Sequence, residues 1–157
     1  MNLASNFEDN VADAVLDEVE RELVGQSDNL VHQAIDRAHE VLEEYGDRHD
    51  YDVGPIIDSL GAVDVQRTDR SITVRLGWEH EAAPYFEYGS SDHTVDGDPI
   101  LSFIWEDAPQ SIHEMFPDTE RVDGDPRVFF GEVEVAGLPE SRFVRTALNW
   151  LRREVTR

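Results

Sequence analysis

Apolar residues in the N-terminal part of the chain recur every three or four positions, which is the spacing of one face of a helix. They form two stripes, with Val11, Val15, Val19 and Leu23 in the first and Leu30, Val31, Ala34, Ile35, Ala38, Val41 and Leu42 in the second. Residues 1–46 therefore predict a helical part with a polar break at 25–28. Ser27 or Asp28 can cap the second helix, and Gly46 can end it.

The middle of the chain changes to a period of two, which is typical of strands with one solvated face. Residues 72–78 alternate in this way after a tight turn at Thr68, so we predict a β-hairpin over residues 62–78. The apolar run 100–105 predicts a buried strand, and 127–135 predicts a further strand.

The last part of the chain, residues 138–156, returns to the spacing of a helix. Its apolar stripe comprises Val144, Leu148, Leu151 and Val155. Pro139 fits the first turn of such a helix. The predicted fold class is α+β: helices in 1–46, a mostly antiparallel sheet of about four strands in 62–135, and the C-terminal helix packed on one face of that sheet. The length fits a single domain covering residues 1–157.

The pentapeptide Val-Asp-Gly-Asp-Pro occurs twice, at 95–99 and at 122–126, each time before a predicted strand. Asp-Gly favours the positive φ of a turn, and Pro prepares the chain for the strand that follows. Carboxylates in such turns can hold a hard cation, but the twelve-residue calcium loop and its closing Glu are missing. We interpret both copies as plain turns.

Composition narrows the range of functions. Asp and Glu number 35 and the basic residues 13, all of them Arg, so the formal net charge is −22. Because Cys is absent, disulfides, thiolate metal sites and cysteine nucleophiles are excluded. The charge repels a phosphate backbone and disfavours nucleic-acid binding. Apolar residues still make up 39% of the chain, which favours a folded protein over a disordered one.

The acidic residues are spread along the chain, and Lys is absent. This pattern suits a cytoplasm of molar salt, where the Debye length is only about 3 Å and like charges hardly repel one another. The distribution has one exception. Residues 1–60 carry a net charge of −13, whereas residues 138–157 carry +3.

The sequence offers no positive argument for an enzyme, and we expect no catalytic residues, no metal and no cofactor. Nucleophile elbows and phosphate-binding loops are absent. His80 and His93 each adjoin a carboxylate, but their spacing matches no metal motif. The competing hypothesis is a small cytoplasmic enzyme or binding module with a pocket near His80, His93 and Glu87. Residues 1–10 resemble no signal peptide, and no run of 18 apolar residues predicts a membrane span.

Two segments stand out by their composition. Residues 83–90 (APYFEYGS) gather three aromatic side chains around one Glu, and residues 142–148 (RFVRTAL) open the predicted C-terminal helix with two Arg. Aromatic residues pack cores, but Tyr and Phe are also enriched at the centres of interfaces. The first segment is therefore either a packed loop or a docking surface. The second is either an amphipathic helix that closes the core or a basic stripe that binds an acidic neighbour.

Together these segments resemble a family of neck and tail-completion proteins of tailed phages, also described as head–tail connectors or putative minor tail components. The matching residues are Tyr85, Glu87, Tyr88 and Gly89 in the first motif and Phe143, Val144, Arg145, Ala147 and Leu148 in the second. Arg142 and Thr146 stand where the family usually has Pro, and Ser90 replaces the more usual Thr. The order of helix, hairpin, aromatic loop, strands and C-terminal helix also agrees.

The resemblance implies a structural virion protein of a haloarchaeal tailed virus, assembled in the host cytoplasm. Copies would form a hexameric or dodecameric ring that joins the capsid connector to the tail, next to other neck and tail proteins, and lets DNA pass without binding it. A tail terminator or tail-tube protein of the same virion is the alternative. The expected interface residues are Tyr85, Phe86, Glu87, Tyr88, Gly89, Phe143, Val144, Arg145, Ala147, Leu148, Arg152 and Arg153.

A ring interface joins two different patches of each subunit. We expect the acidic N-terminal helices and the basic C-terminal helix to supply much of this complementarity, with Arg145, Arg152 and Arg153 as its cationic residues.

The charge leads to a first prediction, about salt. Because like charges repel in dilute buffer and are screened in brine, the melting temperature should rise between about 0.1 M and about 2 M KCl. Circular dichroism across a salt series measures this. A melting temperature that stays constant or falls would contradict the halophilic interpretation.

Overall fold

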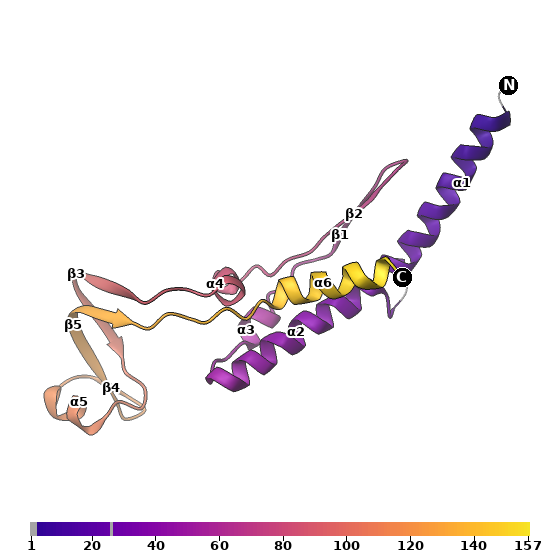
Figure 1. Ribbon diagram of the computed structural model, residues 1–157. Helices are drawn as coiled ribbons and strands as arrows, with labels where there is room; N and C mark the ends of the chain where they lie inside the picture. Colours follow the sequence, from indigo (N-terminus) through magenta and orange to yellow (C-terminus); the bar gives the residue numbers. More distant parts are fainter. Residues whose placement is uncertain (1–2, 26) are drawn as a thin grey trace. The chain divides into compact units, whose positions relative to one another are not determined.

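The computed structural model of the protein describes residues 3–25 and 27–157 (Figure 1). The contacts among its residues group into two compact units. The first unit comprises the chain up to Ser90 together with Pro139–Arg157, and the second comprises Ser91–Leu138. The predicted α+β class is confirmed, because N-terminal helices and a C-terminal helix accompany antiparallel sheets.

The N-terminal helices are α1 (Leu3–Glu20), which continues as a turn of π-helix (Arg21–Gly25), and α2 (Leu30–His49). The cap of α2 lies one residue after the predicted positions. The side chain of Asn29 accepts a hydrogen bond of 2.8 Å from the amide of His32, which satisfies a donor that has no partner inside the helix.

Gly46 does not end α2, as the sequence suggested. The helix continues past it and ends at Asp50, which adopts the left-handed conformation with φ 58° and donates its N–H to the carbonyl of Gly46. A Cβ at position 46 would lie 2.7 Å from the carbonyl oxygen of Tyr51. The glycine is therefore required by the close approach of the following chain, and not by a positive φ of its own.

The core of the first unit is formed by α2 and the C-terminal helix α6 (Phe143–Val155). Buried side chains on α2 are Val31, Ala34, Ile35, Ala38, Leu42 and Tyr45; those from other elements are Ile56, Ala83, Phe86, Phe143 and Ala147. The two helices run antiparallel. Tyr45, near the end of α2, donates to the carbonyl of Pro139 just before α6, and Trp150 borders a hollow with Gln33 near the start of α2.

The C-terminal helix thus packs on a helix, where the sequence analysis placed it on a sheet. The reason lies in the hairpin of β1 (Asp64–Arg67) and β2 (Ile72–Arg75). This hairpin has the predicted position and pairs Asp64 with Arg75 and Arg67 with Ile72. However, every residue of β1 is exposed, so the hairpin offers no buried face comparable to the apolar stripe of α2.

The start of α6 also differs from the expectation. Arg142 adopts a left-handed conformation with φ 59°, so the helix begins at Phe143 and Pro139 lies before it rather than in its first turn. Two shorter helices complete the first unit, α3 (Gly54–Ile57) and α4 (Ala83–Tyr88).

The second unit holds a three-stranded sheet in the order β3-β5-β4, so the strands among the described residues form two sheets and not one. Its elements are β3 (His93–Ile104), α5 (Gln110–Met115), β4 (Arg121–Val122) and β5 (Asp125–Val135). The two long strands, β3 and β5, include the predicted runs 100–105 and 127–135 almost completely. Rings of Trp105, Phe116, Phe129 and Phe130 contact one another on this sheet.

The repeated pentapeptide has two different structures. At 122–126 it forms the predicted turn between β4 and β5, with positive φ at Asp123 and Gly124. At 95–99 the prediction of a turn is wrong, because this copy lies inside β3, where the pairing with β5 shifts between Asp96 and Leu101. A Pro that cannot donate to the sheet is tolerated at such an irregularity.

A polar contact joins α2 to the segment after the hairpin. The indole Nε1 of Trp78 donates to Nε2 of His39 over 3.1 Å, and the two rings meet edge to face at 5.8 Å. The imidazole must be neutral at Nε2 to accept this bond. Desolvation by burial lowers the pKa of His39, although the carboxylates of Asp36, Glu43 and Asp58 act in the opposite direction.

This contact predicts a dependence of stability on pH. The unfolded chain binds a proton at His39 more readily than the folded chain, so the free energy of unfolding should decrease as the pH falls below about 6.5, the ordinary pKa of His. His39→Gln removes this contribution while keeping an acceptor for Trp78. We expect its unfolding free energy to depend less on pH between about 7.5 and about 5 than that of the wild type, measured by urea denaturation in molar salt.

His32→Gln, on an exposed position of the same helix, is the control and should match the wild type. A His39→Gln profile parallel to the wild type would contradict the assignment.

Candidate functional site

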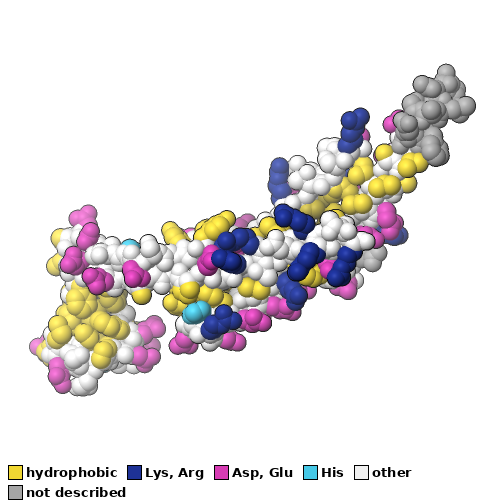
Figure 2. Space-filling view, in the orientation of Figure 1, with side chains coloured by type: hydrophobic (Ala, Val, Ile, Leu, Met, Phe, Trp, Pro, Cys, Tyr) yellow, Lys and Arg dark blue, Asp and Glu magenta, His cyan; other side chains and the backbone are white. Residues whose placement is uncertain are grey.

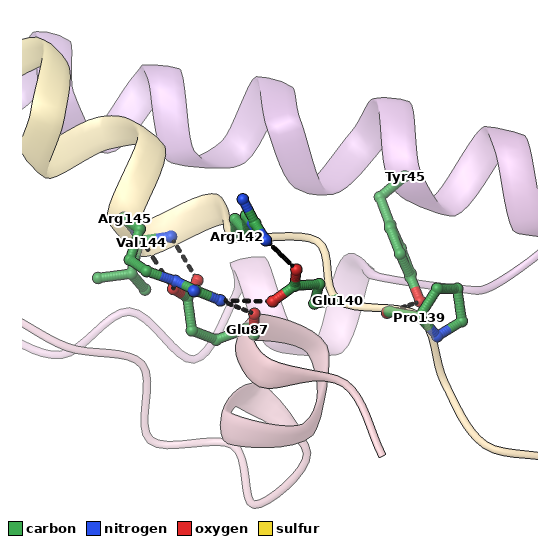
Figure 3. Close-up of polar contacts among 7 residues, drawn as sticks. All are labelled: Tyr45, Glu87, Pro139, Glu140, Arg142, Val144 and Arg145. Carbon is green, nitrogen blue, oxygen red and sulfur yellow. Dashed lines mark hydrogen bonds and ion pairs between the residues drawn. The ribbon is translucent and has the colours of Figure 1, made fainter. Parts of the chain in front are cut away.

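The two segments that stand out in the sequence meet in the first unit. The first forms α4, and the second forms the N-terminal turns of α6 (Figure 3). Their meeting point is Glu87, which is only 4% exposed and is the one buried charged residue among the described parts of the chain. Val144, its partner on α6, follows 57 positions later.

The carboxylate of Glu87 caps α6. One oxygen accepts the amide of Val144 over 2.8 Å, and the other accepts the amide of Arg145 over 3.3 Å and its Nε over 2.7 Å. The amides of the first helical turn have no partners inside the helix, and the positive end of the helix dipole favours an anion there. No side-chain bond comes from Arg142 at the cap position itself. A residue distant in the sequence therefore supplies the cap.

The backbone of α4 is held in the same place. The carbonyl of Phe86 accepts the amide of Ser141 over 2.8 Å, and the carbonyl of Glu87 accepts the amide of Arg142 over 3.3 Å and Nη2 of Arg145 over 3.0 Å. These carbonyls lie at the C-terminal end of α4, where no further helical turn can satisfy them. Helix α4 then ends at Gly89, which has φ 74°. The end of one helix and the start of the other thus satisfy each other.

Glu140 extends the network toward solvent. Its Oε2 contacts Nη2 of Arg145 over 3.0 Å, and its other carboxylate oxygen accepts from the guanidinium of Arg142. The bonds from Arg142, and then those from Arg145, lower the pKa of Glu140. Conversely, Glu87 first and Glu140 second raise the pKa of Arg145. The geometry therefore favours the charged form of both residues.

The predicted interface residues on α4 separate into two groups. Phe86 is buried and contacts the rings of Tyr45 and Tyr51 at 5.6 and 6.0 Å. Tyr85 and Tyr88 are 58% and 70% exposed. The guanidinium carbon of Arg145 lies 5.3 Å from the centre of the Tyr88 ring, a distance at which a cation is attracted to an aromatic face. Phe86 belongs to the core, whereas the two tyrosines are free to contact a partner.

The residues on α6 separate in the same way. Phe143 and Ala147 are buried, and the ring of Phe143 meets that of Trp78 at 5.0 Å. Leu148 is 51% exposed. Within the described part of the chain, Arg152 and Arg153 make no ion pair, whereas Arg145 is bound to Glu87 and Glu140. Of the three arginines assigned to an interface, Arg145 therefore has a clear role inside its own chain.

An apolar groove of about 650 Å³ runs beside these residues, and we call it the α6 groove. It is lined by Val74, Arg75, Leu76, Gly77 and Trp78 from β2 and the segment after it, by Ala83, Pro84, Glu87 and Tyr88 from α4, by Phe143, Val144, Leu148 and Leu151 from α6, and by Val31 from α2. Both oxygens of Glu87 are engaged by α6. The groove therefore offers a surface for binding rather than an available general base.

The residues of the competing enzyme hypothesis do not form one cluster within either unit. His80 and Glu87 belong to the first unit and His93 to the second. The Nδ1 of His80 accepts the amide of Ala82 over 3.1 Å, which is a local turn contact. Across the described residues, no three His, Asp or Glu side chains are placed to hold a metal ion. None of the helices described is both long and apolar enough to span a membrane.

Glu87 stands out in the sequence, but its role as a cap does not. The only local signal was the presence of an acid within an aromatic run, and the helix that it caps is far away in the sequence. In comparisons with protein-family models, with curated proteins and with solved structures, the chain has no match.

The cap predicts the effect of two substitutions. Glu87→Ala leaves the amides of Val144 and Arg145 without their acceptor, and we expect the free energy of unfolding to fall by about 2–4 kcal/mol. Glu140→Ala removes a carboxylate that solvent already reaches, so its loss should be much smaller. Urea denaturation in molar salt, followed by tryptophan fluorescence, compares the free energies of unfolding of the two variants. Equal losses would contradict the capping role of Glu87.

Proposed function

We propose that the protein is a structural subunit of the neck or tail-completion region of a tailed virus, and that it acts as a homo-oligomeric ring between capsid and tail. The observation that supports this proposal most strongly is the meeting of the two resembling motifs. Glu87 of the first motif caps the helix that the second motif begins. The residues that suggest the family thus form one structural element, as expected if they mark a common fold.

The surface of this element also suits self-association. Tyr85, Tyr88 and Leu148 are all more than half exposed, and Tyr is favoured at the centres of protein interfaces. In Figure 2, Arg side chains gather over α6, while acidic side chains are scattered over the rest of the face shown. An acidic subunit can surround DNA without binding its phosphates, which is the property that a passage for DNA needs.

The alternative that the structure favours is a monomeric module that binds an apolar molecule in the α6 groove. The volume of the groove, about 650 Å³, lies within the range of small-molecule sites. This alternative and the ring differ in a property that is simple to measure, the mass of the native protein. A tail terminator or tail-tube protein would also form rings, so its distinction from a neck protein depends on position in the virion.

The ring predicts a native mass of six or twelve copies of the 17.9 kDa chain in molar salt. Sedimentation equilibrium measures this mass, and electron microscopy of the same sample should show closed rings with a central opening. A monomer at all concentrations would contradict the proposal. If native mass spectrometry then showed a bound apolar molecule in that monomer, the binding module would be the better interpretation.

A further inference from the structure

Helix α1 has an apolar stripe that its own chain leaves uncovered. None of the residues 9–20 is buried, and Val11 and Val15 are 46% and 56% exposed. A single helix of this length is only marginally stable in water without tertiary packing. The stripe of Val11, Val15 and Val19 repeats every four residues and so lies on one side of the helix. This side needs a partner surface.

The charge of α1 restricts what that partner can be. Leu3–Glu20 contains six acidic residues and no basic one. Asp17 and Glu20 bind Arg67 of the same chain at 2.6 and 2.8 Å. Glu18, three positions after Val15, lies beside the apolar stripe on the helix, and its ion pair with Arg21 is exposed to solvent. The partner surface should therefore be apolar with a cationic edge.

The α6 groove has these properties. Val144, Leu148 and Leu151 form an apolar stripe on the side of α6 that lines it. Arg145 and Arg152 lie along one edge of this stripe, because the spacing of a helix places them next to Leu148, and Arg75 lines the groove from β2. Arg152 makes no ion pair with any described residue. An acidic helix of α1's composition matches the groove in both polarity and charge.

We propose that α1 of one copy binds in the α6 groove of a second copy, with Val11 and Val15 on Leu148 and its neighbours and Glu18 toward Arg152. This inference depends on the proposed homo-oligomer and specifies its interface. The helix of the same chain is tied to Arg67 at the end of β1. Two α1 helices would place acidic residues against one another. A neighbour's groove avoids both problems.

Such a contact joins two different patches, since every copy has both a helix and a groove. A contact of this kind repeats from copy to copy and closes into a ring when the rotation permits. The apolar stripe provides the affinity, which molar salt does not screen, and the charged edge orients the helix and selects the partner.

Two single substitutions test the contact from its two sides. Val15→Asp places a charge on the stripe of α1, and Leu148→Asp places one in the groove. Both positions are more than half exposed in the single chain, so the fold should tolerate them. Each variant should weaken self-association by about 100-fold or more, because the introduced carboxylate would be buried without a partner. Met115→Asp, at an exposed apolar position of the second unit, is the matched control and should assemble as the wild type does.

Mixing the two variants distinguishes a contact between copies from a general loss of assembly. A Val15→Asp copy keeps its groove and a Leu148→Asp copy keeps its helix, so the mixture has one intact contact per pair. We expect heterodimers in the mixture and monomers in each variant alone, by sedimentation in molar salt. Assembly of both variants like the wild type would overturn the inference and leave the ring intact. A wild type that is monomeric would instead overturn the proposed function.

Crosslinking gives a second and independent measurement. The natural chain contains no Cys, so Val15→Cys and Leu148→Cys each introduce a single thiol. After mixing and mild oxidation, we expect a disulfide-linked heterodimer of twice the chain mass as the main product. A third chain that carries both substitutions tests contact within one chain. If a disulfide forms only inside this double variant, α1 binds its own groove, and the inference is overturned. If disulfides form mainly between two Val15→Cys chains, α1 helices pair with each other, and the inference is likewise overturned.

Discussion

The first unit depends on one buried carboxylate. A carboxylate that loses its water must receive several hydrogen bonds, and Glu87 receives them from the first amides of α6 and from Arg145. These bonds fix the start of α6 against the end of α4. With its start fixed, α6 lays Phe143 and Ala147 on α2, and the same placement forms the groove beside Leu148. The core and the candidate binding surface therefore have a common origin.

The parts of the fold that sequence periodicity determines were predicted well. The stripes of α1 and α2 and the hairpin around Thr68 follow from local patterns of apolar residues. The ends of the helices did not follow from such patterns. Gly46 and Pro139 carry common signals for the end and the start of a helix, but the close approach of Tyr51 and the cap from Glu87 moved both boundaries. These causes lie in distant or folded parts of the chain.

The candidate site was predictable in its residues but less so in their roles. By composition alone, the aromatic run at 83–90 and the basic start of the C-terminal helix each suit either a core or an interface. The structure divides each segment. Phe86 and Phe143 are core, whereas Tyr88 and Leu148 are exposed. Neighbouring residues of a helix point in different directions, so a single segment contains both kinds. The basic charge divides similarly, since Arg145 is bound within its chain, whereas Arg152 makes no ion pair with the residues that the structure describes.

The pairing of β3 with β5 has a consequence for how the chain folds. Glu87 and Val144 are 57 positions apart, and joining them from the unfolded state closes a long loop at a considerable cost in conformational entropy. Strands β3 and β5 pair His93 with Val135 at the two ends of the second unit. Once this pairing has formed, only a few residues on each side separate Glu87 from Val144. The least costly order of events thus forms the sheet of the second unit before α6 meets its cap, although every contact of the cap belongs to the first unit.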